Sequence, residues 1–98
     1  MIELNQLEKY IISKKDKIQI SSKDIKVGDI FLALKGKRFH GNKFISEAIN
    51  KGARFCITDK KNFKENKRII YVNNIYKYLS KIAIHEIIET TNNKTITA

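Results

Sequence analysis

The segment from Val27 to Phe44, VGDIFLALKGKRFHGNKF, decides the fold of this chain. Within it, Ile30–Leu34 is a continuous apolar run of strand length. A run that does not alternate indicates a strand covered on both faces, as in the inner strands of an α/β sheet. The loop Lys35–Gly41 follows, and Asn42 is a suitable N-cap for the next helix, because its side chain can accept from free backbone N–H groups. The segment therefore predicts a strand, a loop and a helix.

The flanking sequence extends this pattern in both directions. Leucines and isoleucines at helical spacing predict a short first helix, and two asparagines precede a longer helix that either of them can cap. The expected elements are a helix at Leu4–Ile12, a strand at Ile18–Ile20, a strand at Ile30–Leu34, a helix from Asn42 to Gly52, strands at Arg54–Thr58 and Ile69–Val72, a helix at Ile75–Thr90 and a strand that begins at Thr95. This order predicts a single α/β domain with a small mixed β-sheet flanked by helices.

Composition restricts the functions that the chain can have. With 42% apolar residues, its 98 residues can form one domain with a modest core. Lysine and arginine number 20 against 10 aspartates and glutamates, and the resulting net charge of +10 favours anionic partners. Because these cations are scattered along the chain, most of them are expected to form an ordinary solvated surface.

Several kinds of site have no support in the sequence. Cys56 is the single cysteine, which excludes an intrachain disulfide, and its apolar neighbours indicate a buried thiol. No spacing of Cys and His matches a zinc site, and neither a GxxxxGK[ST] phosphate loop nor a GxGxxG motif is present. The chain has no signal-peptide pattern and no apolar stretch of membrane-spanning length, so a cytoplasmic location is expected.

The loop Lys35–Gly41 suits nucleotide binding better than catalysis. Its glycines let the backbone approach an anion, Lys37 and Arg38 offer cationic donors, and Phe39 offers a stacking face. The helix N-terminus expected near Asn42 adds a dipole that favours negative charge. His40 lies in the same loop, and no acidic residue stands at a spacing that suggests a partner for it. This pattern is common among α/β loops and does not by itself specify the ligand.

A set of motifs resembles the N-terminal domain of the Mur ligase family, whose pattern is roughly DSR, then GDLFVALKG, then a DGHDFI-like segment. The matching residues are Ser22-Lys23, Gly28–Gly36, Gly41, Phe44-Ile45, Ala48 and Gly52-Ala53. Their order and spacing agree with the family over most of the chain. The form LALKGKRF is more similar to the D-alanyl-D-alanine-adding (MurF-type) ligases than to the diaminopimelate- or lysine-adding (MurE-type) ones.

The resemblance implies a site. In this family the N-terminal domain holds the uridine diphosphate end of a UDP-N-acetylmuramoyl-peptide. Carried over by position, the implied UDP-binding residues are Ile20, Ser22, Lys37, Arg38, Phe39, His40 and Gly41, with no catalytic or metal-binding residue among them. The departures from the family pattern are Ser21 for Asp, Lys23 for Arg, His40 for Asp, and Asn42-Lys43 for His-Asp. They affect the nucleotide contacts rather than the fold.

The resemblance also implies a larger enzyme of peptidoglycan synthesis. Residues 1–91 would form the UDP-substrate-binding domain, and residues 92–98 a linker and the first strand of a central ATPase domain, with a GxxGKT-like loop soon after Ala98. The complete ligase would use ATP and Mg²⁺ to add D-alanyl-D-alanine to UDP-N-acetylmuramoyl-tripeptide. This chain alone would hold no cofactor and be inactive. Its expected partners are the UDP substrate and the central and C-terminal domains of the same monomeric ligase, one of which would cover part of the long helix.

Two alternatives stay open. The first is a MurE-type ligase, in which the domain has the same role and a different amino acid is added. The second is a small basic nucleic-acid-binding module, which would need lysines gathered on one face and aromatic side chains interleaved with them. The scattered charge and the missing aromatic ladder argue against it, so neither nucleic acid nor membrane is an expected partner.

Overall fold

The computed structural model describes residues 5–61 and 64–84. Its strands form one sheet in the order β1-β2-β3-β4. These strands are β1 (Ile18–Gln19), β2 (Ile30–Ala33), β3 (Phe55–Thr58) and β4 (Ile69–Tyr71). The predicted α/β class with a small sheet flanked by helices is confirmed. The sheet was expected to be mixed, but each described pair is parallel, because every connection returns the chain from the carboxyl edge to the amino edge.

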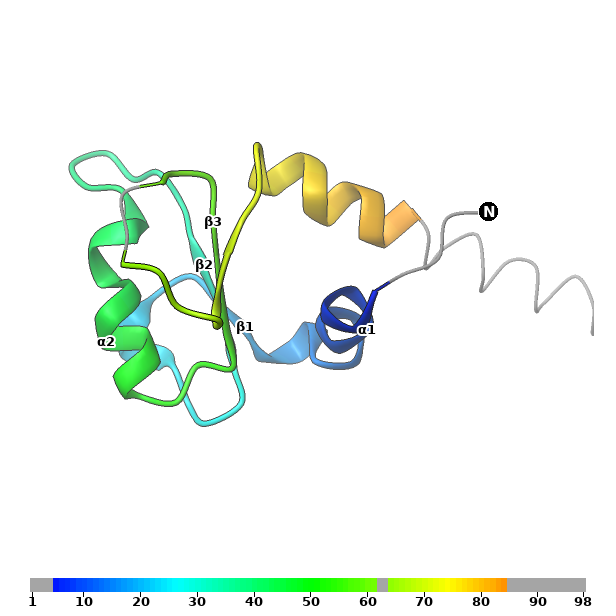
Figure 1. Cartoon of the computed structure of the whole chain (residues 1–98), viewed down its shortest axis with the longest axis horizontal. Helices are drawn as coiled ribbons and strands as arrows, with labels where there is room; N and C mark the ends of the chain where they lie inside the picture. The colour runs from blue at the N-terminus through cyan, green and yellow to red at the C-terminus, as the bar shows by residue number, and fades with distance from the viewer. Residues whose placement is uncertain (1–4, 62–63, 85–98) are drawn as a thin grey trace, which may run out of the picture.

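Helices cover both faces of this sheet. α2 (Ile45–Asn50) packs on one face, and α1 (Gln6–Ser13) lies on the other, together with a third helix described over residues 75–84 (Figure 1). Three short 3₁₀ turns complete the connections, namely η1 (Lys15–Lys17), η2 (Ser22–Asp24) and η3 (Gly41–Phe44). The predicted strand at Thr95, the end of the long helix and the proposed boundary at residue 92 lie outside the described residues.

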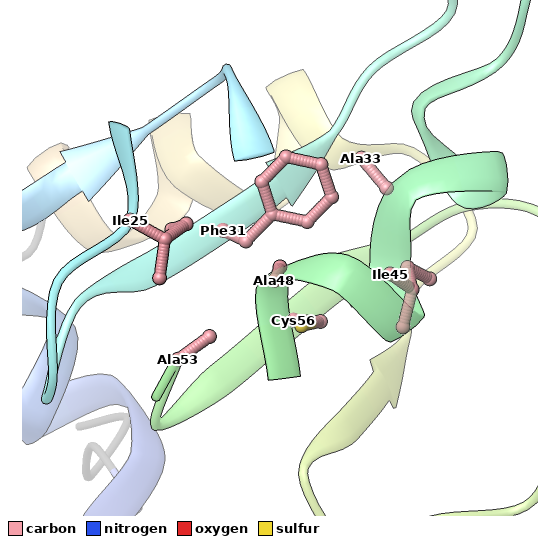
Figure 2. Packing of buried hydrophobic residues seen from close by; sticks show 7 residues of the cluster. All are labelled: Ile25, Phe31, Ala33, Ile45, Ala48, Ala53 and Cys56. Atoms are coloured by element: carbon pink, nitrogen blue, oxygen red, sulfur yellow. The ribbon is translucent and has the colours of Figure 1, made fainter. Parts of the chain in front are cut away.

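Side chains of β2 alternate between the two faces and build two separate cores. Phe31 and Ala33 point toward α2, where they meet Ile45 and Ala48 (Figure 2). Ile30 and Leu32 point to the opposite face and pack with Ile11 of α1 and with Ile75 and Ile82 of the third helix. All four residues of β2 are buried, as the continuous apolar run predicts for an inner strand.

At the helix ends, one predicted cap is confirmed, a second is wrong, and a third cap was not predicted. Asn5 and Glu8 form a capping box on α1, and the Asn74 side chain accepts from the Lys77 N–H at 2.9 Å, so Asn74 caps the third helix as predicted. Asn42 is not an N-cap, so that prediction is wrong. Instead, His40 precedes η3 and accepts a hydrogen bond from the Asn42 backbone N–H.

A backbone hydrogen bond joins two turns at the amino edge of the sheet. Gly28, before β2, and Gly52, after α2, both have positive φ, +92° and +103°, a conformation that glycine adopts readily. The Gly28 N–H donates to the Gly52 carbonyl at 2.9 Å. Asp29 is buried beside them, and its carboxylate accepts from the Lys26 N–H at 2.9 Å. These contacts hold the start of β2 against the end of α2.

The third helix is partly covered. Ile75 and Ile82 are buried, whereas Tyr76 and Ile84 are 65% and 57% exposed. Tyr78 is half-buried near the Glu8 carboxylate of α1, and burial, followed by the Glu8 charge, raises the pKa of Tyr78 to about 12. The described part of this helix therefore packs on the sheet and α1 with one side and leaves apolar side chains on the other. Cover by a neighbouring domain stays a prediction.

Cys56 lies at the centre of β3, fully buried as predicted, and burial raises its pKa from 9.0 to about 11. The thiol therefore keeps its proton in the folded chain at pH values where the unfolded chain loses it. The stability that this difference gives is fully present below pH 9 and is lost as the pH rises through the folded-state value. Between about pH 8 and pH 11, the free-energy difference between the chain and a Cys56→Ala variant should shrink by about 2 kcal/mol. Urea denaturation of both proteins at each pH measures this difference, and a constant difference would contradict the prediction.

Candidate functional site

The carboxyl edge of the sheet brings together the segments that follow the strands. Because all described strands are parallel, their carboxyl ends lie at one edge, the usual place for ligands in α/β folds. Ile20 follows β1, the loop Lys35–Gly41 follows β2, and Asp59 follows β3 directly. The predicted site residues thus come from neighbouring connections of one sheet edge.

The loop after β2 is a tight reversal. Lys35 and His40 form an antiparallel bridge, and the Gly36 N–H donates to the Phe39 carbonyl at 2.9 Å. The Gly41 N–H donates to the Leu34 carbonyl at 2.7 Å. The chain therefore leaves β2, turns through Lys37 and Arg38 at the tip, and returns to the end of the strand.

Gly41 cannot carry a side chain in this arrangement. A Cβ atom there would lie 2.8 Å from the Ala33 Cα and 2.8 Å from the Leu34 nitrogen, and both atoms belong to the backbone. The role that the structure assigns to Gly41 is therefore close approach of the loop to β2. It places the loop without contacting a ligand through a side chain.

The loop tip is exposed and cationic. Lys37 and Arg38 are both exposed and form no ion pair with any other residue in the described part of the chain. Phe39 is 54% exposed, and the Lys43 ammonium lies 3.9 Å from the centroid of its ring. The cationic side chains of Lys37 and Arg38 thus lie next to the Phe39 ring, which is itself in contact with the Lys43 ammonium. This combination suits an anionic ligand that also has a flat ring.

His40 has an acidic partner, contrary to the sequence analysis. Its Nε2 lies 2.8 Å from Asp59 Oδ1, and its Nδ1 accepts from the Asn42 N–H at 3.0 Å. Because Nδ1 accepts, the ring proton of the neutral imidazole is on Nε2, which donates to Asp59. The Asn42 N–H is thus occupied, and the helical segment there is a four-residue 3₁₀ turn. The expected contribution of a helix N-terminus to anion binding is correspondingly reduced.

A second contact joins the same two loops. The Asn42 side-chain amide donates to the Lys60 carbonyl at 3.3 Å. The Lys60 N–H in turn donates to the Thr58 hydroxyl at 3.2 Å, and Thr58 is fully buried in β3. The loop after β2 is thereby fixed to the end of β3 at two points.

Ile20 and Ser22 lie in the connection from β1 to β2. Ile20 is 68% exposed at the end of β1 and can meet a ligand. Ser22 is buried in η2, which packs against α2, and its side chain lies near the Glu47 carboxylate of α2. The Lys51 ammonium, 3.2 Å from that carboxylate, and then the Ser22 hydroxyl hold the pKa of Glu47 below its ordinary value. In this structure Ser22 therefore ties η2 to α2.

Sequence reasoning missed three residues at this edge. Asp59 was not identified as a candidate, although it directly follows the apolar run of β3 and ligands of parallel sheets bind at the carboxyl ends of the strands. Tyr71 ends β4 at the same edge, and the Lys61 ammonium lies 4.8 Å from its ring centroid. No sequence signal pairs these two residues, because their contact depends on the register of β3 with β4.

A separate hollow lies on the face covered by α2. It has a volume of about 710 Å³ and is lined by residues of η3, α2 and the segment that leads into β4, among them Asn42, Ile49, Lys64 and Ile69. None of the predicted site residues lines it. Within residues 5–61 and 64–84, no group of His, Cys, Asp and Glu side chains is placed to hold a metal ion. None of the helices in that part of the chain has the length and apolar character needed to cross a membrane.

The sheet is parallel, is covered on both faces, and has an exposed cationic loop at its carboxyl edge. These features are typical of α/β domains that bind ligands. A family model described as "Mur ligase family, catalytic domain" matches residues 16–93, which include all four strands. The chain belongs to the Mur ligase family, and its fold is that of the N-terminal domain of these enzymes.

Two kinds of ligase are similar to this chain in sequence. The UDP-N-acetylmuramoyl-tripeptide–D-alanyl-D-alanine ligase of Rickettsia prowazekii is 40% identical over 72 residues, which make up 72% of this chain and 16% of that protein. The UDP-N-acetylmuramoyl-L-alanyl-D-glutamate–2,6-diaminopimelate ligase of Rickettsia typhi is 37% identical over 86 residues, or 88% of this chain and 16% of that protein. The chain thus spans 16% of the length of each of these relatives.

Solved structures give the same family. The crystal structure of MurF ligase from Thermotoga maritima in complex with ADP superposes with a TM-score of 0.63 at 39% identity, covering 68% of this chain and 16% of that one. MurF from Acinetobacter baumannii superposes with a TM-score of 0.51 at 28% identity, covering 58% of this chain and 12% of that one.

Proposed function

We propose that this chain is the UDP-substrate-binding domain of a MurF-like ligase, which adds D-alanyl-D-alanine to UDP-N-acetylmuramoyl-tripeptide in peptidoglycan synthesis. The observation that carries the proposal is the loop Lys35–Gly41. It presents two exposed cationic side chains at the carboxyl edge of a parallel sheet and is hydrogen-bonded to both β2 and the end of β3. Such a loop offers donors to a diphosphate without having to order itself first.

Different residues of this edge would contact the phosphates and the uracil ring of a uridine diphosphate, and others would hold the loops in place. Lys37 and Arg38 contact the phosphate oxygens, and the guanidinium of Arg38 can bind two of them at once. The exposed side chains of Phe39 and Ile20 provide the apolar surface for the uracil ring. Gly41 and His40 hold the loop, and Ser22 holds the β1–β2 connection against α2.

The contribution to catalysis is the positioning of one end of a long substrate. The sequence contains no GxxxxGK[ST] motif, so the ATP phosphates and Mg²⁺ belong to other domains of the complete ligase. In that monomeric cytoplasmic enzyme, ATP phosphorylates the peptide carboxylate and the amine of D-alanyl-D-alanine attacks the acyl phosphate. Binding energy from the distant nucleotide serves to orient the reacting end. The isolated chain is inactive and binds its ligand weakly.

The assignment to the MurF type rather than the MurE type is supported by the form LALKGKRF and by MurF structures among the solved neighbours. Both types are found among the sequence relatives. The test is an ATP-dependent phosphate-release assay of the complete ligase that carries this domain. Activity with UDP-N-acetylmuramoyl-tripeptide and D-alanyl-D-alanine is expected. Activity only with UDP-N-acetylmuramoyl-dipeptide and a diamino acid would assign it to the MurE type.

Ligand binding by this chain is tested by calorimetry with UDP, with uridine, and with a short single-stranded oligonucleotide. We expect UDP to bind more tightly than uridine by at least about tenfold, because two charge-assisted contacts to phosphate are lost with the nucleoside. The oligonucleotide should bind weakly and lose its binding between about 0.05 and 0.2 M salt. Tight, salt-sensitive oligonucleotide binding without a response to UDP would favour the nucleic-acid-binding alternative.

A further inference from the structure

We propose that Asp59 is a positioning residue of the nucleotide site: acting through His40, it holds the loop Lys35–Gly41 in the conformation that presents Lys37 and Arg38. The proposal rests on the proposed function for the identity of the ligand and on the geometry of the His40–Asp59 pair for the mechanism. Neither the sequence motifs nor the family pattern points to Asp59, which lies 19 residues from its partner.

The His40 ring is fixed at both nitrogens. Nε2 donates to Asp59 Oδ1 over 2.8 Å, and Nδ1 accepts from the Asn42 N–H over 3.0 Å. A ring flip would place carbon atoms at both contacts, so only one ring orientation satisfies them. The side chain of His40 is 14% exposed and that of Asp59 is 32% exposed, so the hydrogen bond between them is shielded from most of the solvent.

The other end of the pair is anchored in the core. Asp59 directly follows Thr58, the last residue of β3, which is fully buried. The Thr58 hydroxyl accepts from the Lys60 N–H at 3.2 Å and so restrains the backbone on both sides of Asp59. His40 is therefore tied to a fixed point of the sheet rather than to a second flexible loop.

The His40–Asp59 pair also accounts for one departure from the family pattern, which has an aspartate before the glycine that corresponds to Gly41. Here His40 precedes Gly41, and the acidic group is supplied by Asp59 of the neighbouring connection. Because His40 is also bridged to Lys35 across the base of the loop, its orientation fixes where the loop tip lies. The tip itself has no other restraint from a described side chain apart from the Lys43–Phe39 contact.

Loss of the pair should reduce affinity through loop order. When the binding-competent conformation is only a fraction of the population, the apparent Kd rises by the inverse of that fraction. If the Asp59→Ala loop is competent about a tenth of the time, UDP binds about tenfold more weakly. Asp59→Asn keeps an oxygen that accepts from Nε2–H, so its affinity should lie between those of the unmodified chain and Asp59→Ala.

The experiment compares the unmodified chain with Asp59→Ala, Asp59→Asn and Asp16→Ala. Asp16 is an exposed carboxylate in η1, so its removal makes the same change of charge away from the site. Three quantities are measured for each protein: the Kd for UDP, the ¹⁵N heteronuclear NOE of the loop amides, and the tautomer of His40 from long-range ¹H–¹⁵N spectra. The unmodified chain should show the Nε2–H tautomer. Of the three variants, only Asp59→Ala should show both lowered loop NOE values and the whole of the roughly tenfold loss of UDP affinity.

The experiment distinguishes failure of the positioning role of Asp59 from failure of UDP binding by the chain. Unchanged loop NOE values in Asp59→Ala would overturn the positioning role whether or not UDP binds. Equal UDP affinity of Asp59→Ala and Asp16→Ala would also overturn it, as would an Nδ1–H tautomer of His40 in the unmodified chain. Absence of UDP binding to the unmodified chain would instead overturn the proposed function, while the loop measurements still decide whether Asp59 orders the loop.

Discussion

Replacing Phe31 by alanine should lower the free energy of unfolding by about 3–5 kcal/mol, because a large side chain is removed from the centre of a packed core. Phe31 is 1% exposed and packs from β2 toward α2 in a cluster with Ala48 and Cys56, whose small side chains cannot fill the space it would leave (Figure 2). A domain of this size has a total stability of about 5–15 kcal/mol, so the loss removes a large fraction of it. Urea denaturation followed by circular dichroism measures the loss.

The matched control is Phe39→Ala, the same chemical change in the exposed loop. Since Phe39 is 54% exposed and belongs to neither core, its replacement should change stability by less than about 1 kcal/mol. Its effect is expected on UDP affinity instead. Similar losses of stability in the two variants would show that the two-core description of the sheet is wrong.

The second large effect is expected at the loop tip. Simultaneous replacement of Lys37 and Arg38 by alanine should weaken UDP binding by about 10- to 100-fold, because two charge-assisted hydrogen bonds to phosphate are removed. Both side chains are exposed and make no ion pair with other described residues, so stability should be unchanged within about 0.5 kcal/mol. Calorimetric titration with UDP measures the first quantity and urea denaturation the second.

The control for net charge is the double replacement of Lys14 and Lys17 by alanine. These lysines are exposed in the connection before β1, at the amino edge of the sheet, and their loss changes the net charge by the same amount. UDP affinity should stay within about twofold of the unmodified chain, since exposed charges beyond a Debye length are largely screened. Equal losses in both double variants would mean that UDP responds to overall charge and not to a site.

Much of the fold follows from local sequence signals. The run at Ile30–Leu34 is long, apolar on both faces and bounded by glycines, so β2 and its burial were predictable within one residue. The turns at Gly28 and Gly52 require positive φ, which few residues other than glycine tolerate, so the positions of these glycines are consistent with the turns. The parallel arrangement of every described pair was not predicted, because short apolar runs specify a strand without specifying its direction.

The residues of the candidate nucleotide site were predictable only where they are neighbours in the sequence. The loop residues from Lys37 to Gly41 are consecutive, so a motif can contain them. Asp59 reaches His40 only through the parallel register of β2 with β3, which places Ala33 opposite Thr58. The cap at Asn42 was misassigned for a related reason. The Asn42 side chain donates instead to the Lys60 carbonyl of a connection distant in sequence, and His40 caps the 3₁₀ turn by accepting from the Asn42 N–H.

UDP-substrate binding at the loop Lys35–Gly41 can be tested by a ¹⁵N-HSQC titration of the chain with UDP-N-acetylmuramoyl-tripeptide. The amides of Ile20 and residues 37–41 should shift together and saturate, with the Lys43 amide following them. UDP alone should shift the same set, and Asp59 should respond through His40. Shifts scattered over lysines on all sides, produced by an oligonucleotide but not by the UDP ligands, would contradict the account.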